Sequence, residues 1–377
     1  MKNRIYFDNA ATTRVDDNVV EAMLPYLQEQ YGNASAIYSL GKEARYAVEK
    51  ARFQVAEAIG AASPEEIYFV SCGSEADNTA IKGIAYAYRA RGNHIITTKI
   101  EHQAVLETCR FLETQGFEVT YLDVDRNGMV PIEKVERAIT NRTILISIME
   151  ANNEIGTLQP VEEIAKIARK YGVYFHTDAV QAIGNIPVHV QKWGVDALSL
   201  SAHKFHGPKG MGALYVRKGV EFTKFMNGGH QERNKRAGTE NVAGIVGLGE
   251  AIENACSHIE EHAYYVRGLR DYYIKLVKQR MPWAFVNGDM QRRLPGNANI
   301  CFRGMDGKRL LTQLDKKGIC ASVGSACAAG NVNPSHVLLA IGLSPADAKC
   351  SMRTTFDNQN TIEEVEYTVN ALAEIMN

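Results

Sequence analysis

Short apolar, β-rich runs alternate with helical patterns between about residues 64 and 218. The runs lie at residues 66–72, 94–100, 118–124, 144–150, 173–179, 197–203 and 212–218. Most of them are nearly continuously apolar rather than alternating, which is typical of strands covered on both faces. The clearest helical pattern between them is residues 160–171, where Val161 and Ile164 can share one face. This alternation predicts an α/β sheet, mostly parallel, with helices on both sides.

The pattern changes after residue 218. Residues 227–239 are rich in glycine and charge and predict a loop. One long or slightly broken helix is expected from residue 241 to about 281. A smaller α/β unit should follow, with β-like runs at 298–302 and 319–323 and a helix at 362–375. We therefore expect a large domain over residues 15–259, and a small domain made of residues 1–14 and 260–377.

Polar side chains gather where five of the predicted strands end. In an open parallel sheet, ligands bind beyond the carboxyl ends of the strands. The groups are Gly73-Ser74-Glu75, Glu101-His102, Asn152-Asn153-Glu154, Asp178 with Gln181, and Ser201-Ala-His203-Lys204. Each group alone has an ordinary structural explanation, such as a helix cap for Asp178. Together at one sheet edge they favour a functional cleft.

Lys204 and Asp178 are the most informative of these residues. A lysine at a strand end can form a Schiff base with a carbonyl cofactor. A carboxylate on the preceding strand can keep a pyridine nitrogen protonated, which makes pyridoxal phosphate an electron sink. The small-residue turn at Gly73-Ser74 suits a phosphate at a helix N-terminus. The set predicts pyridoxal phosphate, whereas the G-x-x-x-x-G-K-[ST] pattern is absent from the chain.

Composition narrows the class of protein. The 377 residues include 42 Lys+Arg and 43 Asp+Glu, a net charge of −1, which excludes a globally basic nucleic-acid binder and an acidic disordered chain. The 7 cysteines include no C-x-x-C pair, so we expect neither a disulfide scaffold nor a metal site. No stretch approaches the roughly 18 apolar residues of a membrane span, and the N-terminus lacks the apolar core of a signal peptide. We expect a soluble, cytoplasmic protein of enzyme size.

The ordered motifs resemble those of the cysteine desulfurases, pyridoxal-phosphate enzymes of the class V aminotransferase group with fold type I. They include Tyr6-Phe-Asp8-Asn9, Ser74-Glu-Ala-Asp77-Asn78, Ser201-Ala-His203-Lys204, Gly324-Ser-Ala-Cys327 and Ser351-Met-Arg353. The resemblance implies a large domain with a mostly parallel seven-stranded sheet and a smaller α/β domain that carries the Cys327 loop and Arg353. It also implies conversion of L-cysteine to L-alanine with a persulfide on Cys327, which would supply sulfur for iron–sulfur clusters, thiolated tRNA or thio-cofactors.

The resemblance assigns each site residue a role. Lys204 would form the Schiff base and move the substrate α-proton, His102 would stack on the cofactor ring and transfer protons, and Cys327 would be the nucleophile. Asp178 would contact the pyridine nitrogen of the cofactor and Gln181 its phenolic oxygen. The cofactor phosphate would be bound by Gly73, Ser74, Ser201 and His203, and by Thr239 from the other subunit of a homodimer. The substrate carboxylate would be surrounded by Asn33, Asn153 and Arg353, with Asn153 also near the cofactor.

Some positions depart from the family pattern, and several alternatives stay open. Residues 33–38 lack the usual Pro, Ser and His, and residues 354–360 replace a usual S-L-G-like run. A selenocysteine lyase, another class V reaction such as transamination, and a non-catalytic cofactor-binding partner are the alternatives. The charges of Arg233, Lys235 and Arg236 alone fit a solvated loop, the resemblance implies a dimer-interface segment, and nucleic-acid contact is a third, weaker alternative. We expect a homodimer, L-cysteine and a sulfur-acceptor protein as partners, with neither a membrane nor direct nucleic-acid contact.

Overall fold

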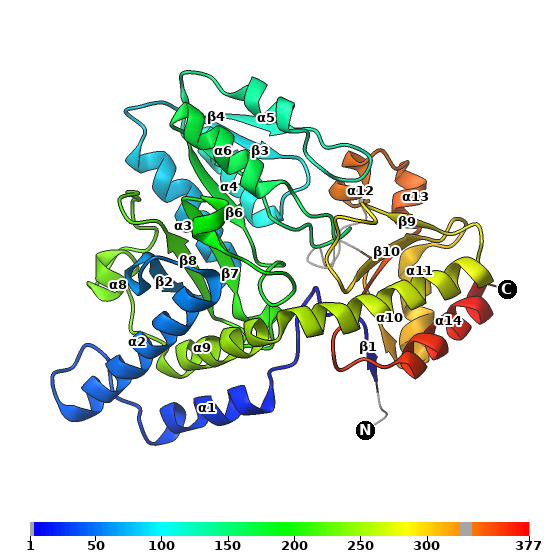
Figure 1. Ribbon diagram of the computed structural model, residues 1–377, viewed down its shortest axis with the longest axis horizontal. Coiled ribbons are helices and arrows are strands. Elements are labelled where there is room, and N and C mark those ends of the chain that lie inside the picture. Colours follow the sequence, from blue (N-terminus) through cyan, green and yellow to red (C-terminus); the bar gives the residue numbers. More distant parts are fainter. Residues whose placement is uncertain (1–3, 324–333, 377) are drawn as a thin grey trace.

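The computed structural model describes residues 4–323 and 334–376. Figure 1 shows a large sheet with helices on both sides and, to its right, a smaller sheet covered by further helices. The long helix α10 (Ile259–Arg280) runs beneath the smaller part. Cys327, the predicted nucleophile, lies outside the described residues.

The large sheet has seven strands in the order β2-β8-β7-β6-β5-β3-β4. Their bounds are Ile67–Val70 for β2, Gly212–Val216 for β8, Ala197–Ser201 for β7, Tyr174–Asp178 for β6, Thr143–Ser147 for β5, His94–Thr98 for β3 and Glu118–Leu122 for β4. The pairings among β4, β3, β5, β6 and β7 are parallel. Strand β8 pairs antiparallel with both β7 and β2. The predicted mostly parallel sheet of seven strands is therefore confirmed.

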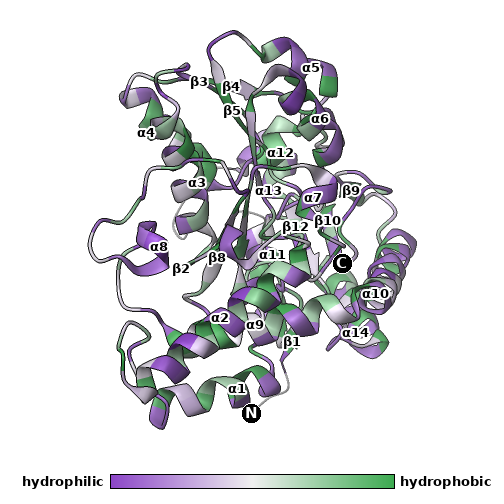
Figure 2. Cartoon of the chain, turned by 60° about the vertical axis from the view of Figure 1, so that its left-hand side comes forward, coloured by the Kyte–Doolittle hydropathy of each residue, from purple (hydrophilic) through white to green (hydrophobic). Residues whose placement is uncertain are grey.

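Helices cover this sheet because each has one apolar face. They are α1 (Asp17–Gln28), α2 (Ser39–Ile59), α3 (Gly73–Ala87), α4 (Gln103–Thr114), α5 (Ile132–Ala138), α6 (Val161–Tyr171), the short α7 (Val190–Trp193) and α9 (Val242–Ser257). Helix α6 starts directly after Pro160 and ends at Gly172, whose φ of 66° suits a glycine. Figure 2 shows helices such as α2 and α4 changing between green and purple along their turns, as expected of helices that bury one face.

The smaller part contains a three-stranded antiparallel sheet in the order β12-β10-β9. These strands are β9 (Phe285–Asn287), β10 (Asn297–Cys301) and β12 (Ser351–Thr355). Strand β1 (Ile5–Tyr6) pairs parallel with β11 (Ile319–Cys320), and α11 (Gly307–Lys316), α12 (His336–Ala340), α13 (Pro345–Lys349) and α14 (Ile362–Met376) complete the unit. Phe7 joins the apolar core of this part. The proposed domain boundaries near residues 15 and 260 stay a prediction.

One local prediction is confirmed and two differ from the structure. The long or slightly broken helix expected from residue 241 to about 281 is broken once, into α9 and α10, which meet at His258. Only the first two residues of the run 319–323 form a strand, although Ser322 bridges to Arg353. The loop expected at 227–239 contains the four-residue helix α8 (Gln231–Asn234), whose Glu232 and Arg233 have positive φ.

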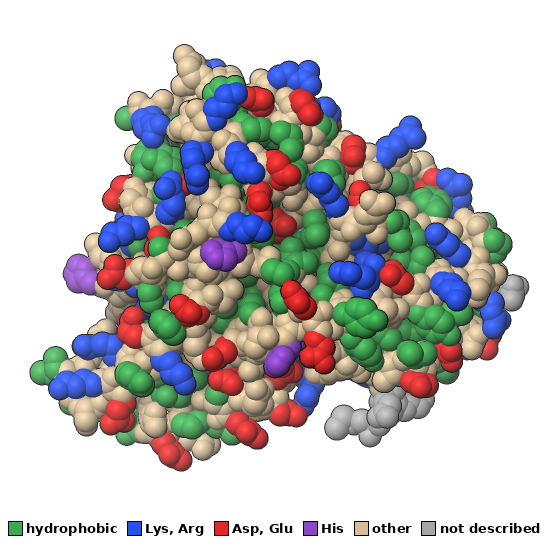
Figure 3. Space-filling view, viewed as in Figure 1, with side chains coloured by type: hydrophobic (Ala, Val, Ile, Leu, Met, Phe, Trp, Pro, Cys, Tyr) green, Lys and Arg blue, Asp and Glu red, His purple; other side chains and the backbone are tan. Residues whose placement is uncertain are grey.

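Acidic and basic side chains both occur on the face of the molecule shown in Figure 3. Figure 3 shows acidic and basic side chains interspersed over it, which fits the net charge of −1. In the described part of the chain, no helix combines the length and apolar character needed to cross a membrane. Residues 4–323 and 334–376 also contain no group of three or more His, Cys, Asp or Glu side chains suited to a metal ion.

Candidate active site

Lys204 lies in a single turn directly after β7, at the carboxyl edge of the large sheet. Its Nζ donates hydrogen bonds to the backbone oxygens of Ala10 (2.5 Å) and Ala11 (2.9 Å). Gln181 Nε2 donates to the same Ala10 oxygen at 3.0 Å. Because one oxygen accepts both hydrogen bonds, the lysine amine and the glutamine amide lie close to each other. Both side chains line a cavity of about 30 Å³.

Asp178 ends β6, the parallel neighbour of the strand that leads to Lys204. Its Oδ1 accepts a hydrogen bond from the Val180 amide at 2.9 Å. Burial raises the pKa of the Asp178 carboxyl, while His102, the Val180 amide and Lys204 act in the opposite direction. A cation placed beside this carboxylate would hold it ionised, and a protonated pyridine nitrogen is such a cation.

A buried polar network that was not predicted from the sequence lies next to Asp178. His176 is held between Ser147 Oγ and Ser199 Oγ, each 2.9 Å from a ring nitrogen. Asp77 Oδ1 lies 3.7 Å from His176 Nε2. Burial lowers the pKa of His176 to about 3, and burial together with the charge of Asp178 raises that of Asp77. The two-residue alternation of β6 would have placed His176 on the same face as Asp178.

The turn at Gly73 has the features of a phosphate site. Gly73 is the first residue of α3, and a Cβ added there would lie 2.7 Å from Val180 Cγ2. Ser201 Oγ is buried and has no hydrogen-bond partner among the described residues. A helix N-terminus with glycine and a free hydroxyl suits an anion. Ser74 follows Gly73 and is exposed.

Charged side chains link this turn to the loop that carries Thr239. Glu75 Oε2 accepts hydrogen bonds from the Ser71 amide (2.7 Å) and hydroxyl (2.5 Å), and Glu75 Oε1 accepts one from Arg236 Nε at 2.9 Å. Arg236 and the Ser71 hydrogen bonds lower the pKa of Glu75, although burial opposes them. The carboxylate near the phosphate turn is therefore paired with a guanidinium.

Two histidines border the same edge of the sheet. His102 caps α4, with Nδ1 accepting from the Ala104 amide at 3.1 Å, so that the ring proton is assigned to Nε2. His203 Nδ1 lies 3.2 Å from Thr12 Oγ1. Burial, Lys204 and Lys209 lower the pKa of His203 to about 4, so it is neutral near pH 7. A neutral His203 would bind a phosphate through a hydrogen bond rather than as a cation.

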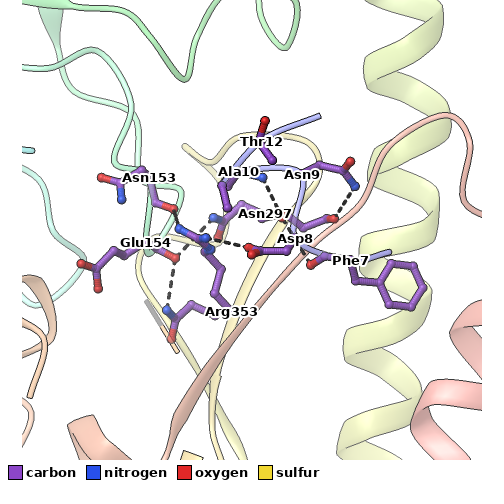
Figure 4. A network of polar contacts seen from close by, with 12 residues as sticks. Phe7, Asp8, Asn9, Ala10, Thr12, Asn153, Glu154, Asn297 and Arg353 are labelled. Atoms are coloured by element: carbon purple, nitrogen blue, oxygen red, sulfur yellow. Dashed lines mark hydrogen bonds and ion pairs between the residues drawn. The ribbon is translucent and has the colours of Figure 1, made fainter. Parts of the chain in front are cut away.

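Arg353 extends from β12 toward the N-terminal segment (Figure 4). Its two terminal nitrogens donate to the backbone oxygen of Asn153 (2.9 Å) and to Asp8 Oδ1 (2.7 Å). The guanidinium is buried, and its Nε has no partner among the described residues. The sequence motifs that contain Asp8 and Arg353 did not indicate that these two side chains contact each other. Asn153 contacts Arg353 through its main chain.

Asn33 and Thr239 do not line the cavity that Lys204 borders. Asn33 is exposed, and its Oδ1 accepts from the Ser35 amide at 2.9 Å. The neighbouring Ala34 and Ser35 line a cavity of about 540 Å³ together with residues 230–233. Thr239 lines another cavity, of about 270 Å³, with Ser71. Lys204 borders neither of these two cavities, so within one subunit they do not place Asn33 or Thr239 next to the lysine.

Comparison with known proteins agrees with this arrangement. The family model described as aminotransferase class-V matches residues 5–368. The chain belongs to this family. It is 51% identical to the cysteine desulfurase IscS of Dictyoglomus turgidum over 376 residues, which cover 100% of this chain and 95% of the relative.

Solved structures of this class V family extend the comparison. A NifS-like protein superposes with a TM-score of 0.94 and 41% identity and covers 99% of each chain. The structure described as SspA in complex with cysteine has a TM-score of 0.82 and 36% identity over 95% of this chain and 100% of that chain. These similarities confirm the predicted fold type I and pyridoxal phosphate as the cofactor. The groups around Lys204 fit that cofactor: an amine, a buried carboxyl, and a glycine-lined helix N-terminus.

Proposed function

We propose that this class V protein is a cysteine desulfurase that converts L-cysteine to L-alanine. The observation that carries the proposal is the 51% identity to a full-length relative named cysteine desulfurase. In this chain, Lys204 and Gln181 also donate to the same backbone oxygen, that of Ala10, near Asp178. The structure with cysteine bound at 36% identity supports the same substrate.

The roles proposed for the cofactor-binding residues come from the family resemblance, and the positions of these residues support them. Pyridoxal phosphate, when bound, supplies an electron sink for the amino acid. Lys204 would hold the cofactor carbonyl carbon and then move a proton with Nζ. Asp178 would keep a proton on the pyridine nitrogen, and Gln181 would donate to the phenolic oxygen. Gly73, Ser74, Ser201 and His203 would bind the phosphate.

The remaining residues act on the substrate. Arg353 offers a planar fork of donors suited to a carboxylate, and Asn33 and Asn153 would complete that site, with Asn153 also near the cofactor. His102 would stack on the cofactor ring and move protons. The thiolate of Cys327 would attack the substrate sulfur: the S–S bond forms, the C–S bond breaks, and the electron pair stays on the substrate carbon. That carbon then takes a proton and becomes the methyl group of alanine.

We infer three further properties of the working protein. It acts as a homodimer in which Thr239 reaches the partner's phosphate site. The persulfide passes to an acceptor protein that serves iron–sulfur clusters, thiolated tRNA or thio-cofactors. The six described cysteines are free, which supports a reducing compartment, the cytoplasm.

The test uses purified protein loaded with pyridoxal phosphate. We expect a visible absorbance band, alanine from L-cysteine, and sulfide when a thiol reductant is added. Cys327→Ala should keep the band and lose desulfuration by at least about 100-fold, because it removes the nucleophile. Cys350→Ala is the matched control, and it should keep activity.

Two outcomes would overturn the proposal. Full turnover of cysteine by Cys327→Ala would exclude a persulfide on that residue. Turnover of selenocysteine, or of an amino-acid and keto-acid pair, without turnover of cysteine would assign the protein to a lyase or a transaminase instead.

A further inference from the structure

His206, two residues after Lys204, is held in an unusual backbone conformation. Its φ is 63°, a left-handed value that side chains other than glycine rarely adopt. The Thr13 hydroxyl accepts a hydrogen bond from the His206 amide at 2.8 Å, and the His206 oxygen accepts one from the Asp16 amide at 3.1 Å. The N-terminal segment thus holds the turn that follows the lysine.

The His206 ring joins this turn to the smaller part of the molecule. Nε2 lies 3.1 Å from Asp357 Oδ2, and Nδ1 lies 3.0 Å from the Arg14 backbone oxygen. Asp357 follows β12, the strand that carries Arg353, by two residues. One ion pair therefore connects the element bearing the lysine amine to the element bearing the predicted carboxylate-binding guanidinium.

Asp357 borders the candidate active site. It is largely buried, and it lines the same cavity as Lys204 and Gln181. Its other oxygen, Oδ1, is buried and has no hydrogen-bond partner among the described residues. The segment 354–360, to which it belongs, also departs from the motif pattern described above.

The surrounding charges favour an ionised pair. Asp357 and Asp16, whose Oδ1 lies 3.5 Å from His206 Nδ1, raise the pKa of His206 to about 9 despite its burial. His206 and His262 of α10 lower the pKa of Asp357, against the effect of burial. Arg14 lies beside Asp16 and acts on it as a further cation. Near pH 7 the pair is therefore a cation bonded to an anion.

We propose that the His206–Asp357 ion pair is a positioning device that fixes Lys204 relative to Arg353, and so sets how the amino acid is held for the reaction. The proposal rests on the function proposed above. Neither residue needs to touch the substrate. Both act through the two elements that they connect, and small misplacements of reacting groups cost rate steeply.

The test uses the loaded enzyme with conservative variants. Asp357→Asn keeps the shape and removes the charge, and Asp357→Glu keeps the charge. His206→Asn tolerates a positive φ and removes the cation. His262→Gln is the matched control, because it changes another histidine near Asp357 that has no hydrogen bond to it.

We expect Asp357→Asn and His206→Asn each to lower kcat/KM for L-cysteine by about 10-fold. Each should also shift the midpoint of the pH titration of the visible absorbance band by at least about 0.5 pH unit, because the environment of Lys204 changes. Asp357→Glu should recover most of both properties, and His262→Gln should leave both near wild type. The wild-type kcat/KM should fall above about pH 9, where the pair loses its cation, and Asp357→Asn should lack that fall.

Other outcomes would overturn the proposal. If the charge-removing variants lower only the unfolding temperature, and keep kcat, KM and the absorbance titration, the pair is a structural staple. The absorbance titration needs only bound pyridoxal phosphate. A wild-type protein without desulfurase activity would therefore refute the proposed function while this readout still decides the role of the pair.

Discussion

Glu101 is a carboxyl group that the fold keeps protonated. It is buried after β3, where Oε1 accepts from the Thr98 hydroxyl at 2.6 Å and Oε2 accepts from the Met149 amide at 3.0 Å. Burial raises its pKa from 4.5 to about 8, since the hydrogen bonds to the carboxylate only partly compensate. At pH 7 the group is mostly neutral, next to a sheet edge that already holds Asp178.

The raised pKa has a consequence for stability. The folded protein keeps this proton between pH 4.5 and about 8, a range in which the unfolded chain has released it. Stability from Glu101 is therefore fully present below pH 4.5 and is lost as the pH rises toward 8. We expect Glu101→Gln, which cannot ionise, to gain about 2–5 °C in unfolding temperature relative to wild type between pH 6 and pH 8.

Thermal unfolding followed by circular dichroism at several pH values measures this difference. Glu57→Gln changes an exposed glutamate on α2 and serves as the control. A difference between Glu101→Gln and wild type that stays constant with pH would contradict the raised pKa.

At the scale of elements, the segment around α8 depends on one buried ion pair. Glu232, Arg233 and Asn234 have φ values of 46°, 54° and 63°, so the backbone needs support from outside the segment. Arg52 on α2 donates two hydrogen bonds of 2.8 Å to the Glu232 carboxylate. The carboxylate also accepts from the Phe69 amide at 2.9 Å. This pair ties the segment that leads to Thr239 to α2 and to edge strand β2.

Removing either Arg52 or Glu232 alone should destabilise the fold, because the remaining charge is buried without its partner. Arg52→Met and Glu232→Leu should each lower the free energy of unfolding by about 3–5 kcal/mol, because each leaves a buried charge alone. The double variant should lose clearly less than the sum of the two. Urea unfolding measures all three values. Glu49→Gln, which removes an exposed partner of Arg52, should cost no more than about 1 kcal/mol, and additive losses in the double variant would argue against coupling.

For the whole molecule, an exposed apolar surface is a candidate contact for the proposed second subunit. Large apolar side chains are exposed on α1, on α2 and between them: Leu24, Leu27, Tyr31, Ile37, Tyr38, Tyr46 and Phe53. Ile37 is 86% exposed, and the nearby cavity of about 540 Å³ lies beside Asn33. Neither Asn33 nor Thr239 lines the cavity of Lys204 within one chain, so a second subunit would give them a site to complete.

We expect a mass of twice 41.7 kDa in light scattering. The double variant Ile37→Glu with Tyr38→Glu should dissociate the dimer and weaken binding of pyridoxal phosphate by about 10-fold or more, because Thr239 would be lost from each phosphate site. Tyr264→Glu, at an 80% exposed position on α10, should change neither property. A wild-type monomer at micromolar concentration would refute the dimer.

Most of the fold was predictable because its strands are buried on both faces. Such strands appear as continuous apolar runs, and β7 and β8, for example, lie inside their predicted ranges. The positive φ values of Glu232 and Arg233 were not predictable. They depend on contacts with distant elements, such as the Arg52 side chain, that leave no local pattern.

The sequence by itself determined the class of chemistry, because Lys204 and Asp178 follow apolar strands and parallel strands bring their ends to one edge. It also contained His176 and Asp357 without showing their importance. Only the tertiary structure decided that Asp77 lies beside His176, that Asp8 pairs with Arg353, and that His206 reaches Asp357. These partners are far apart along the chain. Their contacts exist only once the sheet, the N-terminal segment and the smaller part pack together, and burial then sets which of these groups carry charge.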